Sequence, residues 1–280
     1  MHPDNQQDLL KDLTIPPRPD VVNVMFAELR KDEPNLKRVS AAIVKDPGIS
    51  AGIIRAANSP FCGVSRRISS LPKAIEVLGL RYVTNLASGL AIRYAMQNNH
   101  KGPSLDAFWQ RTENTAMLCH YIARRLHGIS PDDAFSYGLF HDCGIPLLIQ
   151  RFPHYAETAR RANDANFVGT CQVEESETGT SHSILGYFLA RAWFLPDDMC
   201  QAILIHHDAR AYVDRKTDDS VRDLVGIGHL AEHIQQRWLG HASDSEWERF
   251  CAPVTKHFGL ADDDISDLAD GGRAALFGDA

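Results

Sequence analysis

Histidines and one aspartate in the second half of the chain are of the types that build a metal centre. The dipeptide His141-Asp142 is followed by His182 and then by the pair His206-His207. Imidazole binds zinc, iron, nickel and manganese, whereas a carboxylate suits harder ions and can bridge two of them. These five residues are therefore the candidate ligands of a divalent metal ion (Fe, Mn, Ni or Zn), and the alternative is a protein with no cofactor.

Each of these residues also has an ordinary structural interpretation. The aspartate of a buried His-Asp pair can simply hold its neighbour by a hydrogen bond, and His182 can be a surface residue at a helix start. Histidines at a helix C-terminus, such as His206 and His207, are stabilised there when protonated. Adjacent helical residues point about 100° apart. Both histidines therefore reach one centre only if the helix end is directed at it, or else they have different roles.

A later stretch carries polar residues that could complete such a centre. Glu232 and His229 are three residues apart and share one face of an expected helix. The alternative interpretation is that both residues are solvated groups on the surface.

The elements that position these residues are expected to be helices. Apolar residues recur at helical spacing and no alternation of period two is visible, so the predicted fold is all-α. Asp20 is expected to cap the first helix, and Gly144 would let another backbone approach the dipeptide. Around the candidate ligands, the predicted helices span about 105–126, 131–150, 153–166, 182–194, 196–207, 218–239 and 243–258, with a polar loop over 168–181.

Composition divides the chain into four parts. Residues 1–13 are predicted to be a flexible leader, and the polar stretch QNNHKGPS at 97–104 is the candidate boundary. We therefore expect an N-terminal helical subdomain over 14–100 and a helical subdomain over 101–258. Residues 259–280 form an acidic tail that is expected to fray.

The bulk composition favours a soluble, cytoplasmic protein. The 280 residues carry a net charge of −7, which excludes a broad basic field for nucleic acid. The six cysteines are scattered without a CxxC pair, as in proteins with reduced thiols. No apolar run approaches the roughly 18 residues that a membrane helix needs, and the polar N-terminus lacks a signal peptide.

Nucleic-acid binding remains a third hypothesis, which rests on two small basic clusters. One contains Arg66-Arg67, Lys73 and Arg81, and the other is Arg160-Arg161. Clusters of this size are usually solvated faces, so nucleic acid is an unlikely partner.

Longer segments resemble a known family. IPPRPDVV, VKDPGISAGIIRAANSPFCGVSRRISSLPKAIEVLGL and the helix around Trp109 match the first half of the HDOD family. YGLFHDCG, GTSHSILGYFLARAWFLP and AILIHH match its second half, so the resemblance covers roughly residues 14–210. HDOD proteins are non-canonical relatives of HD-type phosphohydrolases. The resemblance implies an N-terminal helical subdomain packed on an HD-like helical bundle, and a bacterial signalling role with no established common catalytic activity.

The chain departs from the pattern of the HD enzymes at three points. Arg111, in FWQRTENTA, falls where those enzymes place a histidine, and arginine has no lone pair to give a metal. Glu232 falls at the place of their last metal aspartate. The lysine that often follows the dipeptide is absent, because Cys143-Gly144-Ile145-Pro146 occupies that stretch. These changes argue against an efficient two-metal phosphohydrolase.

Two functions follow from this pattern. The first is a regulatory module without efficient catalysis, which acts through a signalling protein partner or a ligand. Apolar residues around Phe61-Cys62-Gly63 and Trp193-Phe194 are candidate contacts, with burial in the core as the alternative. The second is a phosphodiesterase-like hydrolase with a single metal ion, in which Arg111 binds substrate phosphate. The sequence does not predict the oligomeric state.

Overall fold

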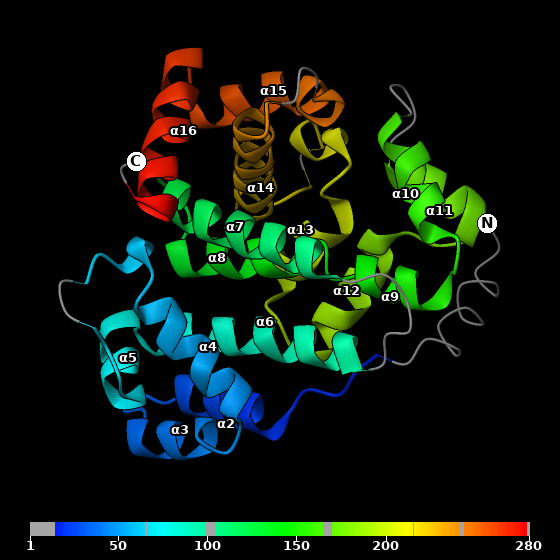
Figure 1. Cartoon of the computed structure of the whole chain (residues 1–280). Helices are drawn as coiled ribbons and strands as arrows, with labels where there is room; N and C mark the ends of the chain where they lie inside the picture. The colour runs from blue at the N-terminus through cyan, green and yellow to red at the C-terminus, as the bar shows by residue number, and fades with distance from the viewer. Residues whose placement is uncertain are drawn as a thin grey trace. The chain divides into compact units, whose positions relative to one another are not determined.

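Helices and turns build the whole described part of this protein. The computed structural model describes residues 15–64, 67–98, 105–164, 170–214, 216–240 and 244–278. Within these ranges there is no strand, which confirms the predicted all-α fold (Figure 1). The predicted leader and most of the predicted 97–104 boundary lie outside the described residues. None of the described helices combines the length and apolar composition required to cross a lipid bilayer.

The chain groups into two compact units. One comprises Pro16–Asn98 together with the segment that starts at Asp270, and the other includes Asn99–Ala269. The last helix, α16 (Asp262–Phe277), runs through this division. All of the candidate metal ligands belong to the unit that includes Asn99–Ala269.

The first unit is a cluster of short helices around aliphatic side chains. Its helices are α2 (Asp20–Leu29), α3 (Leu36–Ile43), α4 (Pro47–Ala57), α5 (Leu71–Leu78) and α6 (Leu80–Asn98). The prediction that Asp20 caps the first helix was wrong, because Pro19 occupies the N-cap position and Asp20 is the first helical residue. An acidic residue in the first turn still stabilises the helix dipole.

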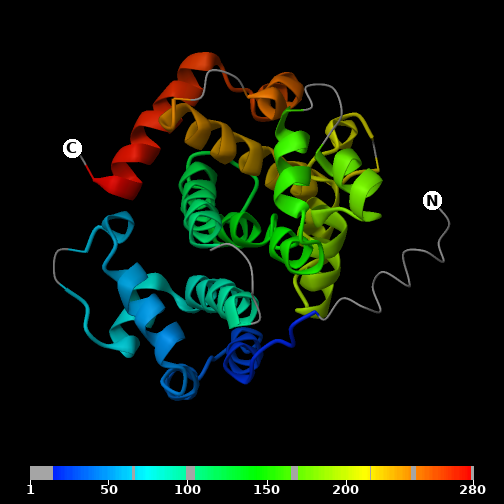
Figure 2. The ribbon, with the colours of Figure 1, turned by 45° about the vertical axis from the view of Figure 1, so that its right-hand side comes forward.

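The second unit is a bundle in which α14 packs against α7 and α8 (Figures 1 and 2). Its helices are α7 (Asp106–Ala123), α8 (Pro131–Phe140), α9 (Ile145–Arg151), α10 (Tyr155–Asp164), α11 (Thr170–Thr178), α12 (His182–Ala192), α13 (Asp197–Ile205), α14 (Asp219–Trp238) and α15 (Ser245–Phe258). Proline or aspartate in the first turn starts several of these helices, since neither residue disrupts that turn and aspartate favours its positive end.

The single helix predicted over 131–150 is in fact two helices. α8 ends at Phe140 and α9 begins at Ile145. Pro146 is the physical reason, because a proline inside a helix lacks the N–H donor and its ring clashes with the carbonyl four residues earlier, which belongs to Asp142. The chain therefore turns at the candidate ligands, and the Asp142 carbonyl instead accepts a hydrogen bond from Ile145 N at 2.9 Å.

Two segments predicted to lack structure are helical. The polar stretch 168–181 contains α11, which buries Glu174 completely. The predicted acidic tail contains α16, whose buried apolar residues include Ile265 and Leu268 at helical spacing. In both cases a polar composition concealed a helix, because α11 buries polar groups that find partners and α16 starts with three aspartates that favour a helix N-terminus.

The apolar pair Trp193-Phe194 divides between core and surface. Trp193 is 1% exposed, whereas Phe194 is 66% exposed and has a positive φ of 57°. The residues Phe61 and Cys62 are half-buried.

The basic residues of the two predicted clusters pair with acids where the structure describes their contacts. Lys73 binds Glu76 at 2.7 Å, and Arg160 binds Glu157 at 2.7 Å. Arg66 lies outside the described residues. Such pairs are typical of solvated helix faces.

The stability of the second unit is expected to depend on pH through His120. Burial, together with the nearby charge of Arg124, lowers the pKa of His120 from 6.5 to about 4. His120 therefore becomes protonated below pH 6.5 in the unfolded chain, but only below about pH 4 in the folded protein. This contribution to stability is complete above pH 6.5 and is lost as the pH falls toward 4.

Replacing the titrating ring should flatten that profile. We expect the free energy of unfolding of His120→Gln to fall less than that of the parent between pH 6.5 and 4, by at most about 3 kcal/mol. Urea unfolding at a series of pH values measures the difference. Identical pH profiles for the two proteins would contradict the assignment.

Candidate metal centre

The five predicted ligands converge on one place in the second unit. His141 and Asp142 lie in the turn between α8 and α9, His182 begins α12, and His206 and His207 directly follow α13. Asp142 Oδ2 is 3.4 Å from His141 Nε2, while its Oδ1 is 3.6 Å from His182 Nε2 and 3.7 Å from His206 Nε2. Asp142 therefore belongs to two groups that could each hold an ion, as a bridging carboxylate does.

Both members of the histidine pair reach this place. α13 ends at Ile205, and the helix end is directed at the centre. The Nε2 atom of His182 is 3.2 Å from His206 Nε2 and 3.0 Å from His207 Nε2. His206 and His207 can therefore both contribute to one centre, because the end of α13 is directed at it.

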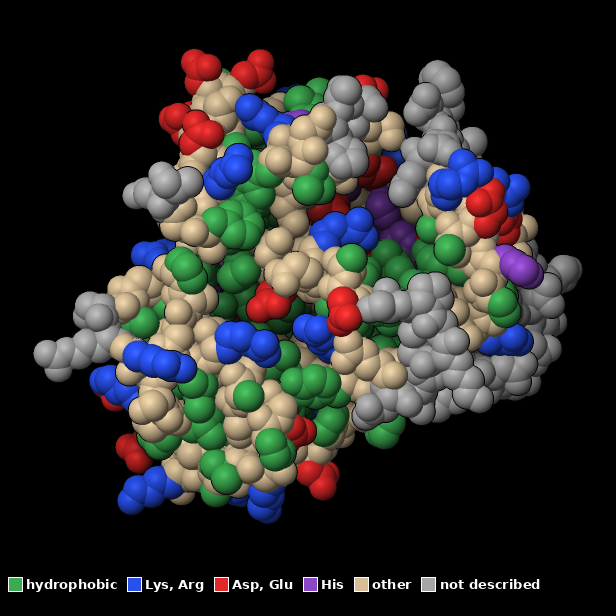
Figure 3. All heavy atoms as spheres, viewed as in Figure 1, with side chains coloured by type: hydrophobic (Ala, Val, Ile, Leu, Met, Phe, Trp, Pro, Cys, Tyr) green, Lys and Arg blue, Asp and Glu red, His purple; other side chains and the backbone are tan. Residues whose placement is uncertain are grey.

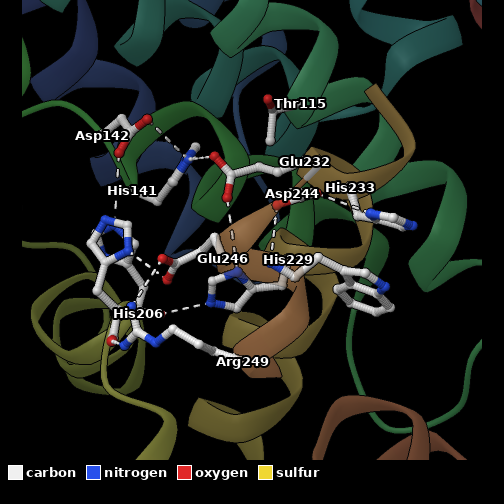
Figure 4. A network of polar contacts seen from close by, with 12 residues as sticks. Thr115, His141, Asp142, His206, His229, Glu232, His233, Asp244, Glu246 and Arg249 are labelled. Atoms are coloured by element: carbon white, nitrogen blue, oxygen red, sulfur yellow. Dashed lines mark hydrogen bonds and ion pairs between the residues drawn. The ribbon is translucent and has the colours of Figure 1, made fainter. Parts of the chain in front are cut away.

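Glu232 completes the group around His141. It projects from α14 and places its Oε1 atom 3.3 Å from His141 Nε2 (Figure 4). With His141 and Asp142 it forms one of the groups that could hold an ion. The carboxylate is 34% exposed, so it lies at the solvent side of the centre. Figure 3 shows histidine side chains reaching the surface beside acidic and basic ones.

His229, one turn before Glu232 on α14, holds the backbone of the ligand His206. Its side chain is buried and stacks on Phe250 at 3.6 Å between ring centroids. Its Nε2 atom donates a hydrogen bond to the backbone carbonyl of His206 at 2.7 Å. His229 therefore positions a ligand and does not face an ion.

All four ligand histidines have their Nδ1 atom held by an oxygen atom of the protein. Each Nδ1 lies against an oxygen that can only accept a hydrogen bond, so Nδ1 carries a proton and Nε2 is the atom whose lone pair is available when the ring is neutral. The pairs are His141 with Gly138 O (3.0 Å), His182 with Glu174 Oε2 (2.7 Å), His206 with Ile203 O (2.7 Å) and His207 with Glu246 Oε1 (2.9 Å). Metal-binding histidines characteristically have their second nitrogen held in this way.

The sequence analysis missed the two carboxylates that hold these rings. Glu174 is fully buried in α11 and accepts hydrogen bonds from the backbone N of His182 at 2.9 Å, from His182 Nδ1 and from the hydroxyl of Tyr155. Glu246 lies in the first turn of α15. No spacing marks Glu174 in the sequence, because polar residues surround it and conceal which face of the helix is buried.

The electrostatics of the centre favour a positive charge between its carboxylates. Burial lowers the pKa of His141, but the charges of Asp142 and Glu232 outweigh it and the net pKa lies well above the ordinary value. Burial and the neighbouring His206 hold the pKa of His207 well below its ordinary value. The two carboxylates thus favour a positive charge between them, either a protonated His141 or a bound cation, whereas burial favours neutral His207, which can donate its lone pair.

Arg111 lies on an exposed part of α7. The described ion pairs of Asp142 are with His141, His182 and His206. The guanidinium of Arg111 remains a candidate for binding an anion.

Comparison with known proteins identifies the class of this helical bundle. The HDOD domain model matches residues 15–209, and the chain therefore belongs to the HDOD family. A Shewanella amazonensis structure described as a "Putative phosphohydrolase" is 23% identical, with a TM-score of 0.70 over 96% of each chain. A Marinobacter aquaeolei "Putative signal transduction protein" is 21% identical, with a TM-score of 0.71, and the match covers 97% of this chain and 63% of that one.

A curated relative in Treponema pallidum is much longer than this chain. It is 21% identical over 199 residues, which make up 69% of this chain and 38% of the relative. The Shewanella and Marinobacter structures resemble this chain in fold. Glu232 and Glu246 lie after the last residue that the family model matches.

The approach of α9 to α12 should be essential to the geometry of the centre. A Cβ atom on Gly144 would lie 2.0 Å from His182 O and 2.8 Å from Gly186 N, both backbone atoms that cannot move aside locally. We expect Gly144→Ala to destabilise the protein by about 1–3 kcal/mol or more and to lower its affinity for metal. Thermal unfolding and metal titration measure the two effects.

Gly186→Ala is the graded control for this prediction. Its added Cβ would meet the Ile203 side chain at 3.0 Å, which can shift. A Gly144→Ala protein as stable as Gly186→Ala would contradict the proposed constraint.

Proposed function

We propose that this HDOD protein is a regulatory module whose second unit binds a divalent transition-metal ion. It would act through a protein partner or a ligand rather than through efficient turnover. One observation supports the metal-binding part: four imidazoles direct their Nε2 atoms at one centre while oxygen acceptors hold every Nδ1. The residues that would hold the ion are His141, Asp142, His182, His206, His207 and Glu232.

The distances between the nitrogens fit this proposal. His182 Nε2 and His207 Nε2 are 3.0 Å apart, close enough to share either a hydrogen bond or a metal ion. Two nitrogen lone pairs that face each other at this distance repel unless a proton or a metal cation lies between them. Two nitrogens bound tetrahedrally to zinc at its usual bond length are separated by about 3.3 Å, close to the distance observed.

The stretch that follows the dipeptide favours a regulatory role over efficient catalysis. Cys143 and Pro146 flank Gly144 and Ile145 there, so no lysine follows Asp142. The histidine expected early in α7 of an HD enzyme is Arg111, which cannot bind an ion. The Marinobacter structure, which has the same fold, is described as a "Putative signal transduction protein", and this description is consistent with a regulatory role.

A phosphohydrolase is the second candidate, and a specific observation favours it. Asp142 is shared by two donor groups, one with His141 and Glu232 and the other with His182 and His206. A bound divalent ion would lower the pKa of water and polarise a phosphoryl oxygen. Under this alternative, the exposed guanidinium of Arg111 would bind the substrate phosphate.

Metal analysis of protein purified without a chelator or a nickel column tests the centre. We expect about one ion per chain in the parent and its loss in Asp142→Asn, because that carboxylate belongs to two of the three donor groups and lies 3.6 Å from Nε2 of His182, a member of the third. His257→Gln is the matched control, since His257 pairs with Asp223 at 2.7 Å and lies outside the donor groups. Metal-free protein after purification from metal-replete cells would refute the proposal.

A turnover assay separates the two functions. We expect the parent, supplied with manganese or nickel, to hydrolyse a cyclic dinucleotide or a generic phosphodiester no faster than His141→Ala does. Turnover that His141→Ala abolishes would replace the regulatory proposal with the hydrolase. A further loss in Arg111→Ala, with metal content unchanged, would assign phosphate binding to Arg111.

A further inference from the structure

A cysteine lies beside the histidines on the side away from His141. The Sγ atom of Cys171 and one ring nitrogen each of His182 and His207 lie within 4.8 Å of one another. Cys171 is half-buried in the first turn of α11. The sequence analysis treated the cysteines only as scattered thiols.

We propose that Cys171 is a further ligand of the centre and that the ion beside His182 and His207 is a thiolate-binding metal, Zn²⁺ or Fe²⁺. This inference rests on the metal centre proposed above and adds the class of metal. Thiolate is a soft donor that selects such ions over Mg²⁺ and Ca²⁺, which prefer oxygen. Sulfur, imidazole and carboxylate together form a donor set that zinc accepts.

The position of Cys171 follows from the contact between α11 and α12. Cys171 and Glu174 are three residues apart and share one face of α11. Glu174 holds both the backbone N and the Nδ1 atom of His182, at 2.9 and 2.7 Å. These two hydrogen bonds hold the face of α11 that carries Cys171 against His182. The thiol is thus placed by a buried interaction and not by a mobile surface side chain.

A neighbouring hydroxyl is in place to stabilise a thiolate. The Sγ atom of Cys171 is 2.7 Å from Ser183 Oγ, and either atom can donate the hydrogen bond. When a divalent ion binds, the sulfur–metal bond replaces the S–H bond and the proton leaves to solvent. Ser183 can then donate to the sulfur, which no longer has a proton of its own.

Cobalt(II) is a suitable probe, because its absorption reports the ligands directly. We expect Co²⁺-loaded parent protein to show both visible d–d bands and a near-ultraviolet thiolate-to-cobalt charge-transfer band. Cys171→Ala should lose the charge-transfer band, keep d–d bands and bind zinc about tenfold or more weakly. Cys251→Ala is the control, since Cys251 is also half-buried and lies in α15, outside the donor groups.

The outcomes distinguish this inference from the proposed function. Visible bands without a charge-transfer band in the parent would overturn the role of Cys171 and leave the metal centre standing. No cobalt spectrum at all would overturn both. A charge-transfer band that persists in Cys171→Ala would also overturn the assignment.

Alkylation of the unmutated protein makes the test independent of how well the variant folds. Bound zinc should protect Cys171 from iodoacetamide and leave the labelling of Cys251 unchanged, as mass spectrometry of peptides would measure. Equal labelling of Cys171 with and without zinc would contradict its role as a ligand.

Discussion

The carboxylate of Asp142 is the group on which the arrangement of the second unit depends. It lies between imidazoles from three segments of the chain, with His141 on one oxygen and His182 and His206 on the other. A charge in such surroundings is costly unless positive partners meet it from every side. Pro146 prevents a continuous helix through this residue, which lies between the end of α8 and the start of α9, and Gly144 lets the start of α12 approach. The break in the helix and the absence of a side chain are therefore both requirements of one buried charge.

The sequence allowed the ligands to be identified more readily than the groups that hold them. His141, Asp142, His182 and the pair at 206–207 are visible because a His-Asp dipeptide followed by further histidines is a chemically distinctive pattern. Gly144 was expected to allow close approach, and the structure agrees. Glu174 was hidden, because in α11 a polar face is the buried one. Hydrophobic periodicity detects a helix whose apolar face is buried, and it fails where hydrogen bonds replace apolar contacts.

The centre also extends beyond the part of the chain that defines the family. Glu232 on α14 and Glu246 on α15 lie after residue 209, where the family match ends. One faces His141 and the other holds His207. α14 and α15 thus supply one possible ligand and one positioning group. The fold of the family brings the histidines together, whereas these two acids are contributed by the C-terminal helices of this chain.

An ion at this centre would act on the fold as well as on chemistry. Its ligands come from the α8–α9 turn, the start of α12, the end of α13 and α14, so binding would tie four segments to one point. Any ligand that binds only the folded protein stabilises it in proportion to the logarithm of its concentration over Kd. Glu174 would transmit that constraint to α11, and Glu246 would transmit it to α15, because each holds a ligand ring directly. Metal occupancy would in this way set the rigidity of helices that carry no reacting group, which is what a regulatory module requires of its ligand.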